Sequence, residues 1–139
     1  IEKHRTQKNI ESTIELAEII KKSFPPKYYK KHPATKTFQA IRIFINNEIQ
    51  ELHEGLNQAF NLLKENGKIC VVTFHSIEDK LVKNFTNKVC LRNKKTKLIK
   101  PSSKEILSNP RSRSAKLRVI KRERLNFNYI PISELGFEL

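Results

Sequence analysis

The sequence predicts an α/β fold in which helices lead into a short sheet. Apolar residues recur at helical spacing over residues 14–63, "KICVVTF" (68–74) is a short run rich in β-branched residues, and "KLRVIKR" (116–122) alternates apolar and basic residues. The predicted order is helix, helix, helix, strand, helix, strand, strand. This order indicates the second half of an α/β sheet closed by a hairpin, and not a complete sheet.

The first predicted helix begins at Ser12 or Thr13, either of which can cap it. Its apolar positions are Ile14, Leu16, Ala17, Ile19 and Ile20. Pro25 and Pro26 stop it, because proline lacks the backbone donor that a helix interior needs. The following "KYYKKH" (27–32) is a polar loop that carries aromatic residues.

The second predicted helix has Pro33 at its first position, where a missing N–H costs nothing. One apolar stripe then follows along a single face, made by Phe38, Ile41, Ile45, Ile49 and Leu52. Gly55 is expected to break this helix. A third helix then carries Leu56, Phe60 and Leu63 and ends at Asn66–Gly67.

The remaining elements follow the glycine. "KICVVTF" is expected to be a buried strand, and Ser76 three residues before Asp79 marks the start of a helix. The apolar face of that helix is Ile77, Leu81, Val82 and Phe85. Beyond it the chain is basic and loop-like, with short strands expected at 96–100 and 116–122.

Charge is concentrated in one segment. The 139 residues carry a formal net charge of +14, and from Lys80 to Arg124 there are 16 lysines or arginines against two acids, Glu105 and Glu123. Such a segment attracts phosphate backbones through counterion release, which favours RNA or DNA as partner over a merely solvated surface. An anionic membrane is disfavoured, because no strongly amphipathic basic helix and no apolar run of roughly 20 residues is present.

Several kinds of site are excluded by composition and spacing. The three glycines, Gly55, Gly67 and Gly136, lie far apart, so a nucleotide or S-adenosylmethionine (SAM) site cannot be assembled here in the usual way. The scattered histidines and the lone pair Cys70 and Cys90 disfavour a zinc site and a disulfide framework, which suits a reducing cytosol. The absence of methionine suggests a piece of a longer protein or a trimmed product.

Two places carry candidate site residues. His75 and Ser76 stand where the predicted strand meets a helix start, a position at which α/β sheets bind ligands. The alternative is that Ser76 only caps the helix and His75 only fills the turn. On the second helix, Arg42 and Asn46 flank the apolar stripe, and Arg42 is expected to be partly buried and paired with Glu48 or Asp79.

The stretch "NPRSRSAKLR" (109–118) has four basic residues in ten positions. It runs directly into an expected strand, which favours a fixed segment over a flexible tail. If it were extended, Arg111 and Arg113 would project the same way and suit a phosphate.

Three stretches together identify a resemblance. "HPATKTFQAIRIFINNEI", "GKICVVTFHSIEDKLVKNF" and "NPRSRSAKLRV" are similar in order and character to motifs of the RsmH (MraW) family. These are bacterial SAM-dependent methyltransferases that modify N4 of a cytidine in 16S ribosomal RNA, and a mitochondrial relative is the near alternative. The resemblance covers roughly residues 10–122 and only the C-terminal half of the family pattern.

The resemblance implies a fold and a division of the chain. It implies the C-terminal half of a Rossmann-like class I methyltransferase sheet plus the end of an inserted helical domain. Residues 1–31 would end the helical insertion, residues 32–124 would form the C-terminal part of the methyltransferase domain, and residues 125–139 are a tail without assignment. The glycine-rich SAM loop would lie upstream of Ile1, so no cofactor-binding residue is expected in this chain.

The resemblance also implies roles and partners. We expect His75, Ser76, Arg42 and Asn46 to contribute to the target-base pocket, and Arg111, Arg113, Lys116 and Arg118 to contact the RNA backbone. The expected partner is 16S ribosomal RNA or the small ribosomal subunit in a bacterial cytoplasm, with a homodimer left open. Two alternatives stand beside this enzyme: an inactive RNA-binding or structural fragment, and a generic DNA-binding module that no helix-turn-helix or zinc motif supports.

Overall fold

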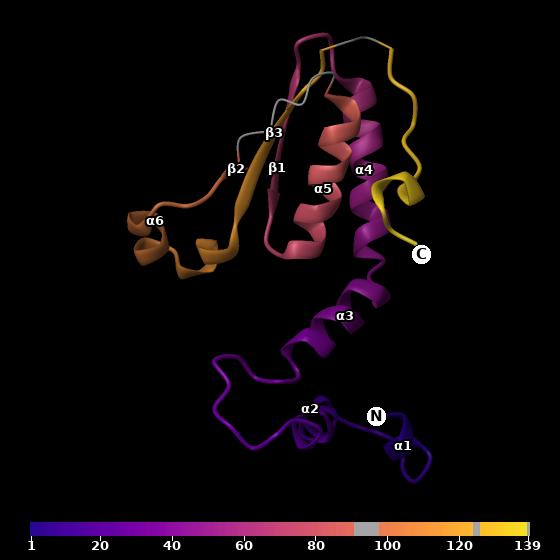
Figure 1. Ribbon diagram of the computed structural model, residues 1–139, viewed down its shortest axis with the longest axis vertical. Helices are drawn as coiled ribbons and strands as arrows, with labels where there is room; N and C mark the ends of the chain where they lie inside the picture. The colour runs from indigo at the N-terminus through magenta and orange to yellow at the C-terminus, as the bar shows by residue number, and fades with distance from the viewer. Residues whose placement is uncertain (91–97, 124–125, 139) are drawn as a thin grey trace. The chain divides into compact units, whose positions relative to one another are not determined.

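A computed structural model describes residues 1–90, 98–123 and 126–138. The chain divides into two compact units, Ile1–Glu48 and Ile49–Leu139 (Figure 1). None of the helices within the described ranges is both long enough and apolar enough to cross a membrane.

The first unit is helical. It contains α1 (Glu2–Arg5), α2 (Thr13–Lys22) and α3 (Thr35–Ile45). The prediction for α2 is confirmed: the Ser12 hydroxyl accepts the N–H of Glu15, and the helix ends at Lys22 before the two prolines. The helix α3 begins two residues after Pro33, which therefore precedes the helix instead of opening it.

The break in the second predicted helix lies elsewhere than expected. The helix α3 ends at Ile45 with Asn46 as its C-cap, and Asn47 takes a positive φ of 53°. The helix α4 (Glu48–Leu62) then runs through Gly55 without interruption. Asparagine is among the few residues that adopt the left-handed conformation readily, so Asn47 supplies the turn that was expected at Gly55.

The second unit contains a three-stranded sheet in the order β1-β3-β2. The strand β1 (Lys68–Thr73) and the short β2 (Leu98–Ile99) both pair antiparallel with β3 (Lys116–Lys121). The helix α5 (Ser76–Val89) connects β1 to the region of β2, which confirms the expected order of strand, helix and closing pair of strands. Residues 96 and 97 of the strand predicted at 96–100 lie outside the described residues.

The hairpin is wider than expected, because α6 (Ser103–Ser108) and the 3-10 helix η1 (Pro110–Ser114) separate β2 from β3. Strand pairing places Thr73 opposite Lys116. The end of β1 and the start of β3 therefore lie at the same end of the sheet (Figure 1).

The helix α5 covers one face of the sheet, and α4 packs beside it. Leu81, Val82 and Phe85 of α5 are fully buried, as is Ile120 of β3. The rings of Phe60 on α4 and Phe85 meet edge to face at 5.9 Å. These side chains form the core of the second unit.

The opposite face of the sheet is open, which corrects the expectation of a fully buried strand β1. Along β1, exposure alternates, and Val72 and the following Phe74 are 53% and 55% exposed. In β3 the basic residues face the helices, since Arg118 is only 7% exposed. Leu117 instead lies opposite Val72 on the open face. The strand β3 is therefore half-buried, as its alternation predicted, but the side that carries Arg118 faces the helices.

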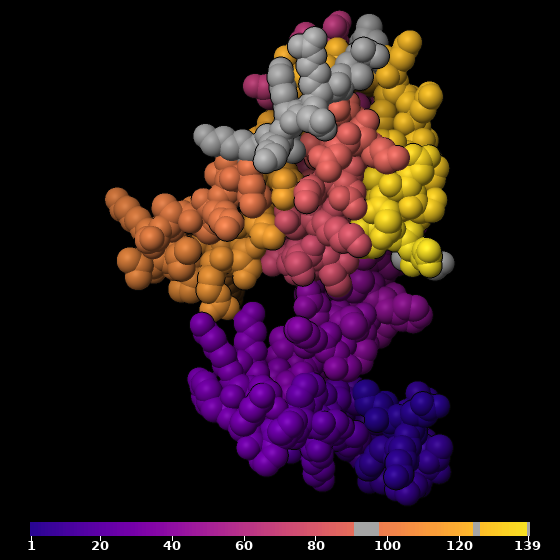
Figure 2. All heavy atoms as spheres, in the orientation of Figure 1, coloured from indigo at the N-terminus to yellow at the C-terminus, as the bar shows by residue number. Residues whose placement is uncertain are grey.

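Residues 126–138 pack against the helices of the second unit and end in the 3-10 helix η2 (Ile132–Leu135). Leu135 is fully buried, and its carbonyl accepts a hydrogen bond from the Asn84 amide of α5 at 2.8 Å. Figure 2 shows this segment, in yellow, lying along α5. The stretch that the sequence left unassigned is thus part of the fold.

Candidate functional site

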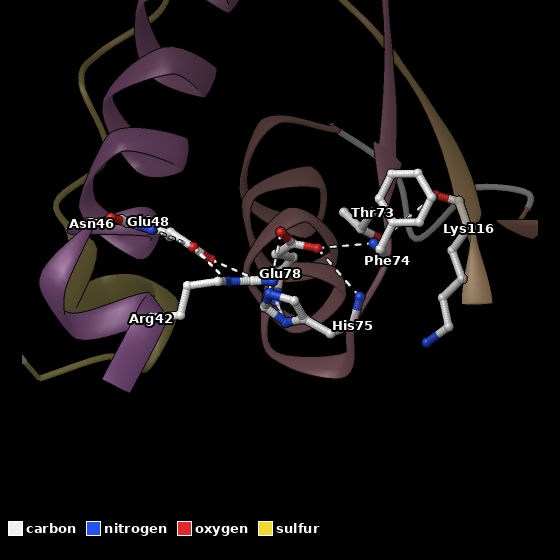
Figure 3. A network of polar contacts seen from close by, with 8 residues as sticks. All are labelled: Arg42, Asn46, Glu48, Thr73, Phe74, His75, Glu78 and Lys116. Atoms are coloured by element: carbon white, nitrogen blue, oxygen red, sulfur yellow. Dashed lines mark hydrogen bonds and ion pairs between the residues drawn. The ribbon is translucent and has the colours of Figure 1, made fainter. Parts of the chain in front are cut away.

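The junction between β1 and α5 is built by His75. The His75 side chain caps α5 by accepting the Glu78 N–H at Nδ1 (3.3 Å). In return, the Glu78 carboxylate accepts the backbone N–H groups of Phe74 at 2.9 Å and His75 at 3.2 Å (Figure 3). This reciprocal pair is a capping box.

The capping box corrects the position expected for the cap of α5. Ser76 was the expected cap, but it is the exposed first residue of the helix, and the cap is one position earlier. Because Nδ1 of His75 accepts a hydrogen bond, the proton of the neutral imidazole lies on Nε2, which is 3.1 Å from Glu78 Oε1. This nitrogen is enclosed at the junction, with the Glu78 carboxylate as its neighbour.

Arg42 and Asn46 belong to the first unit and meet at Glu48. The Arg42 guanidinium donates from Nε and Nη2 to the two carboxylate oxygens at 2.8 and 3.0 Å, and the Asn46 amide donates to Oε1 at 3.2 Å (Figure 3). The prediction of Glu48 as partner is confirmed. The predicted burial is wrong, because the Arg42 side chain is 56% exposed.

Asp79, the other partner proposed for Arg42, binds two basic residues of β3. Its carboxylate accepts from Lys116 Nζ at 2.9 Å and from Arg118 Nε at 2.8 Å. Burial alone would raise the pKa of Asp79, but the hydrogen bonds from Arg118 and Lys116 outweigh it and lower the pKa below its ordinary value. Asp79 is therefore ionised at neutral pH and holds both cations against α5.

This ion pair gives Arg118, a predicted RNA contact, a role in the fold. A side chain that is almost fully buried and engaged by Asp79 does not offer its charge to an RNA phosphate. Lys116 keeps a 30% exposed side chain but shares the same carboxylate. Of the four residues predicted to contact the RNA backbone, Arg111 and Arg113 are the two with exposed side chains and no such role in the fold.

Arg111 and Arg113 lie on η1, a fixed turn and not a loose arm. Ser112 between them is 7% exposed, and its hydroxyl donates to the Asn109 carbonyl at 2.8 Å. The turn is helical and not extended, so residues two apart point about 120° away from each other around the axis. The two guanidinium groups thus face different directions, which suits contacts to separate phosphates better than a single fork.

The sheet brings part of the predicted site together. His75 follows Thr73 by two residues, Arg113 precedes Lys116 by three, and Thr73 pairs with Lys116. The Thr73 hydroxyl also lies 3.5 Å from the Lys116 carbonyl. The basic turn η1 and the junction of β1 with α5 consequently lie at one end of the sheet (Figure 1).

Sequence reasoning missed two members of this site. Glu78 completes the cap and Asp79 orients the basic side of β3, although both were visible as acids in the first turn of α5. A histidine three residues before a glutamate is the pattern that would have located the cap. Five of the sixteen basic residues of the segment 80–124 lie outside the described residues: Arg92, Lys94, Lys95, Lys97 and Arg124.

The glycines of the chain do not fit a SAM cradle, which needs a glycine-rich turn between a strand and a helix. Gly55 lies within α4. Gly67 precedes β1 in a tight turn, where an added Cβ would lie 2.8 Å from the Lys64 carbonyl oxygen. Gly136, with a φ of 73°, ends η2 in the C-terminal segment. No glycine therefore stands where the cofactor would require one.

Comparison with known proteins shows which family and which relatives the chain resembles. Residues 1–123 match the model of the MraW methylase family. A protein of Sulfurihydrogenibium sp. (strain YO3AOP1), named ribosomal RNA small subunit methyltransferase H, is 50% identical over an alignment of 128 residues that covers 88% of this chain and 44% of that protein. Proteins of the same name from Wolbachia pipientis wMel and Coxiella burnetii are 48% and 44% identical, over 85% of this chain in each case.

The chain spans less than half the length of these relatives, at 40% to 44%. The match nevertheless covers most of its residues, including the cap at His75, the turn η1 and the strands β1 and β3. The chain therefore belongs to the MraW methylase family.

Proposed function

We propose that the chain is part of an enzyme that transfers a methyl group from SAM to N4 of a cytidine in 16S ribosomal RNA. The family match and the name of the relatives support a methyltransferase that acts on small-subunit ribosomal RNA. The observation that carries the role of this chain is the strand register, which brings the basic turn η1 and the capped junction at His75 to one end of the sheet. A cytoplasmic enzyme is expected.

The turn η1 is proposed to hold the RNA backbone. Arg111 and Arg113 are exposed and are positioned by the buried Ser112. Each arginine that binds a phosphate releases condensed counterions, so its contribution appears as salt-dependent affinity. Lys116 is a weaker candidate because it shares Asp79 with Arg118, and Arg118 serves the fold.

The junction of β1 with α5 is proposed to contribute to the target-base pocket. The N4 amine of cytosine is a poor nucleophile because its lone pair is delocalised into the ring, so the enzyme must orient this amine and give its departing proton an acceptor. His75 Nε2 is enclosed and lies 3.1 Å from the Glu78 carboxylate, so it would reach a base only if that carboxylate moved away, and the exposed Ser76 lies beside it. Arg42 and Asn46 rank lower, since Glu48 already engages both.

The cofactor side of the enzyme is proposed to lie outside this chain, and no step is assigned to SAM here. The apolar residues on the uncovered face of the sheet support this, since a methyltransferase domain has helices on both faces. A groove of about 200 Å³ on that face is lined by apolar residues that include Val72, Ile99 and Leu117. Within the described residues β1 pairs only with β3, so its other edge is open to a further strand.

On this proposal, residues 1–31 end an inserted helical domain and residues 32–124 form the C-terminal part of the methyltransferase domain. The alternative is an RNA-binding or structural fragment without catalysis. The misplaced glycines favour that alternative for the isolated chain. Both accounts share the same RNA-binding surface, and they differ in whether methyl transfer appears once the sheet is completed.

A chimera tests the reaction. This chain would be joined to the part of the Sulfurihydrogenibium relative that lies outside the match, and the product incubated with SAM and 16S ribosomal RNA. We expect N4-methylcytidine after nuclease digestion and mass spectrometry. A folded chimera that binds SAM and RNA but methylates another base, or none, would contradict the proposal.

The role of η1 is tested by RNA affinity. The Arg111→Ala/Arg113→Ala variant of this chain should bind 16S ribosomal RNA more weakly and with a salt slope smaller by about 1.4 to 1.8, the value for two lost phosphate contacts. The matched control, Lys3→Ala/Lys36→Ala, removes two exposed cations far from η1 in sequence. An unchanged slope in the arginine variant would remove η1 from the RNA surface.

A further inference from the structure

A second surface with the chemistry of RNA binding lies in the first unit. Residues 21–31, "KKSFPPKYYKK", here called the lysine–tyrosine loop, join the end of α2 to the segment before α3. The loop contains five lysines and three aromatic residues and no acid. The proposed function, which uses η1 and the β1–α5 junction, does not account for it.

Two of the three aromatic rings are held in place. The Tyr29 hydroxyl donates to the Pro25 carbonyl at 2.9 Å, and its ring meets that of Phe24 edge to face at 5.9 Å. The Lys27 ammonium lies 5.5 Å from the centre of the Tyr29 ring. These contacts give the loop a fixed aromatic base although it has no regular secondary structure.

The third ring is presented to solvent. Tyr28 is 91% exposed, the largest exposed fraction among the large apolar and aromatic residues of the described chain. An isolated exposed aromatic is common on protein surfaces. Tyr28 differs in its neighbours in the sequence, which are the fixed rings of Phe24 and Tyr29 and the cations Lys30 and Lys31. A nucleotide there could stack its base on the ring and pair its phosphate with a lysine.

Three of the five lysines have contacts within the fold, Lys21 and Lys22 at the end of α2 and Lys27 at the Tyr29 ring. Lys21 pairs with Glu18 at 3.6 Å, and both Lys21 and Lys22 stabilise the negative end of the α2 dipole. Lys27, Lys30 and Lys31 are exposed and have no carboxylate within ion-pair distance in the described parts of the chain. Their charge is therefore available to an anion.

A cavity of about 380 Å³ lies beside the fixed rings. Apolar residues of the loop and its flank line most of it, with lysines and one glutamate among the lining: Phe24, Pro25, Pro26, Tyr29 and Pro33 are joined by Lys21, Lys22, Lys27 and Glu18. Tyr28 does not line this cavity, so a base stacked on Tyr28 would lie outside it.

We propose that the lysine–tyrosine loop binds single-stranded RNA, with one base stacked on Tyr28 and the flanking phosphates bound by Lys30 and Lys31. Single-strand binding proteins combine aromatic platforms with cationic tracks in this way, since only unpaired bases expose their faces. A duplex would meet the lysines but not the ring. The inference rests on the proposed function in that RNA is the substrate, and it adds a second contact that is independent of η1.

The test compares RNA forms and matched variants of the full chain by fluorescence anisotropy. The probes are a labelled single strand of about 12 uridines, within the site size of one binding module, and a hairpin duplex of similar length. Tyr28→Leu, which keeps an apolar side chain but loses the ring face, should weaken single-strand binding about tenfold and leave duplex binding unchanged. Tyr28→Phe should retain the affinity.

The lysines are tested by salt. Lys30→Ala/Lys31→Ala should reduce the single-strand salt slope by about 1.4, whereas Lys3→Ala/Lys36→Ala should leave it unchanged. Phe44→Leu controls for loss of an exposed ring, because Phe44 is 86% exposed on α3 outside the loop.

The outcomes separate this inference from the proposed function. If the Arg111→Ala/Arg113→Ala variant loses RNA affinity but Tyr28→Leu and Lys30→Ala/Lys31→Ala do not, the loop inference fails and the proposed function stands. If the unmodified chain binds neither RNA probe, both fail. Binding of vesicles containing anionic phospholipid that Tyr28→Leu abolishes, without any effect on RNA, would overturn the loop inference in favour of a membrane surface.

Discussion

Asp79 determines how the basic side of β3 is used. Its carboxylate binds Lys116 and Arg118, and the Arg118 side chain is almost fully buried as a result. A buried guanidinium is tolerated only with a partner, because the desolvation of an unpaired charge is costly. The residue that appeared to be an RNA contact is therefore one that attaches β3 to α5.

The first prediction concerns this ion pair. Asp79→Asn should lower the free energy of unfolding by about 2 to 3 kcal/mol at neutral pH, because Arg118 is left buried without its carboxylate. Urea unfolding followed by circular dichroism measures this change. Glu65→Gln, an exposed acid in the turn before β1, is the control and should have no measurable effect.

The same pair makes stability depend on pH. The pKa of Asp79 is lower in the folded state than its ordinary 3.8, so its contribution is complete above that pH and is lost as the pH falls through the folded-state value. Below pH 3.8 the unmodified chain should lose stability faster than Asp79→Asn, and the two should converge. Parallel curves across this range would show that the carboxylate does not stabilise the fold.

The second prediction separates the two roles of His75. His75→Ala should destabilise the chain by about 1 kcal/mol through loss of the cap on α5, and His75→Asn should retain the cap. If the imidazole contacts the target base, His75→Asn in the chimera should reduce methylation about tenfold at unchanged stability. Full methylation in a stable His75→Asn chimera would leave His75 a purely structural residue.

At the level of elements, hydrogen bonds attach the C-terminal segment, residues 126–138, to α4. Because the Ile130 carbonyl can only accept, His53 donates to it from Nε2 at 2.7 Å, and the Asn57 carbonyl oxygen accepts the Ile130 N–H at 2.9 Å. Tyr129 packs edge to face on His53 and donates to Glu54 at 2.6 Å, and this hydrogen bond raises the pKa of the Tyr129 phenol. The segment lies beyond the family match, which covers residues 1–123.

The third prediction tests this attachment. Asn57→Ala leaves the buried Ile130 N–H without its acceptor and should cost about 1 to 3 kcal/mol of unfolding free energy. The amide hydrogen of Ile130 should also exchange faster with solvent. Asn61→Ala, an exposed position on the same helix, is the matched control and should change neither quantity. Protection of Ile130 that survives Asn57→Ala would mean that the other contacts of the segment, such as those from His53 and Tyr129, hold it without Asn57.

The elements show which features the sequence could predict. The helix α2 follows from its apolar spacing and from Ser12, both of which act locally. The break at Asn47 does not follow from periodicity, because a positive φ at asparagine leaves no mark on the apolar stripe, whereas Gly55 looked like a break and lies inside α4. The cap of α5 was predicted at Ser76, one residue after its actual position at His75, because serine is the commoner cap and histidine seldom has this role.

Sequence patterns could not predict contacts between side chains that are far apart in the sequence. The alternation in β3 correctly predicted a half-buried strand, but not which side is covered, because the burial of Arg118 depends on Asp79, 39 positions earlier. The C-terminal segment carried no recognisable motif, and its place depends on His53 and Asn57, more than seventy positions away in sequence. The three motifs that identified the family needed no such contacts.

At the scale of the whole molecule, the chain combines RNA-binding chemistry with a sheet that is covered on one face. Exposed cations lie on η1 and in the lysine–tyrosine loop, while Val72, Phe74 and Ile99 leave the other face of the sheet apolar and uncovered. The glycines stand in a helix, a tight turn and a terminal segment, and none opens a helix after a strand. We propose that this chain holds RNA and that the methyl donor is bound elsewhere.

Calorimetric titration of the chain with SAM and with 16S ribosomal RNA tests this claim most directly. The account predicts no heat of binding with SAM, and RNA binding whose affinity falls steeply as salt rises. Saturable SAM binding in the micromolar range, or RNA binding that is insensitive to salt, would contradict it.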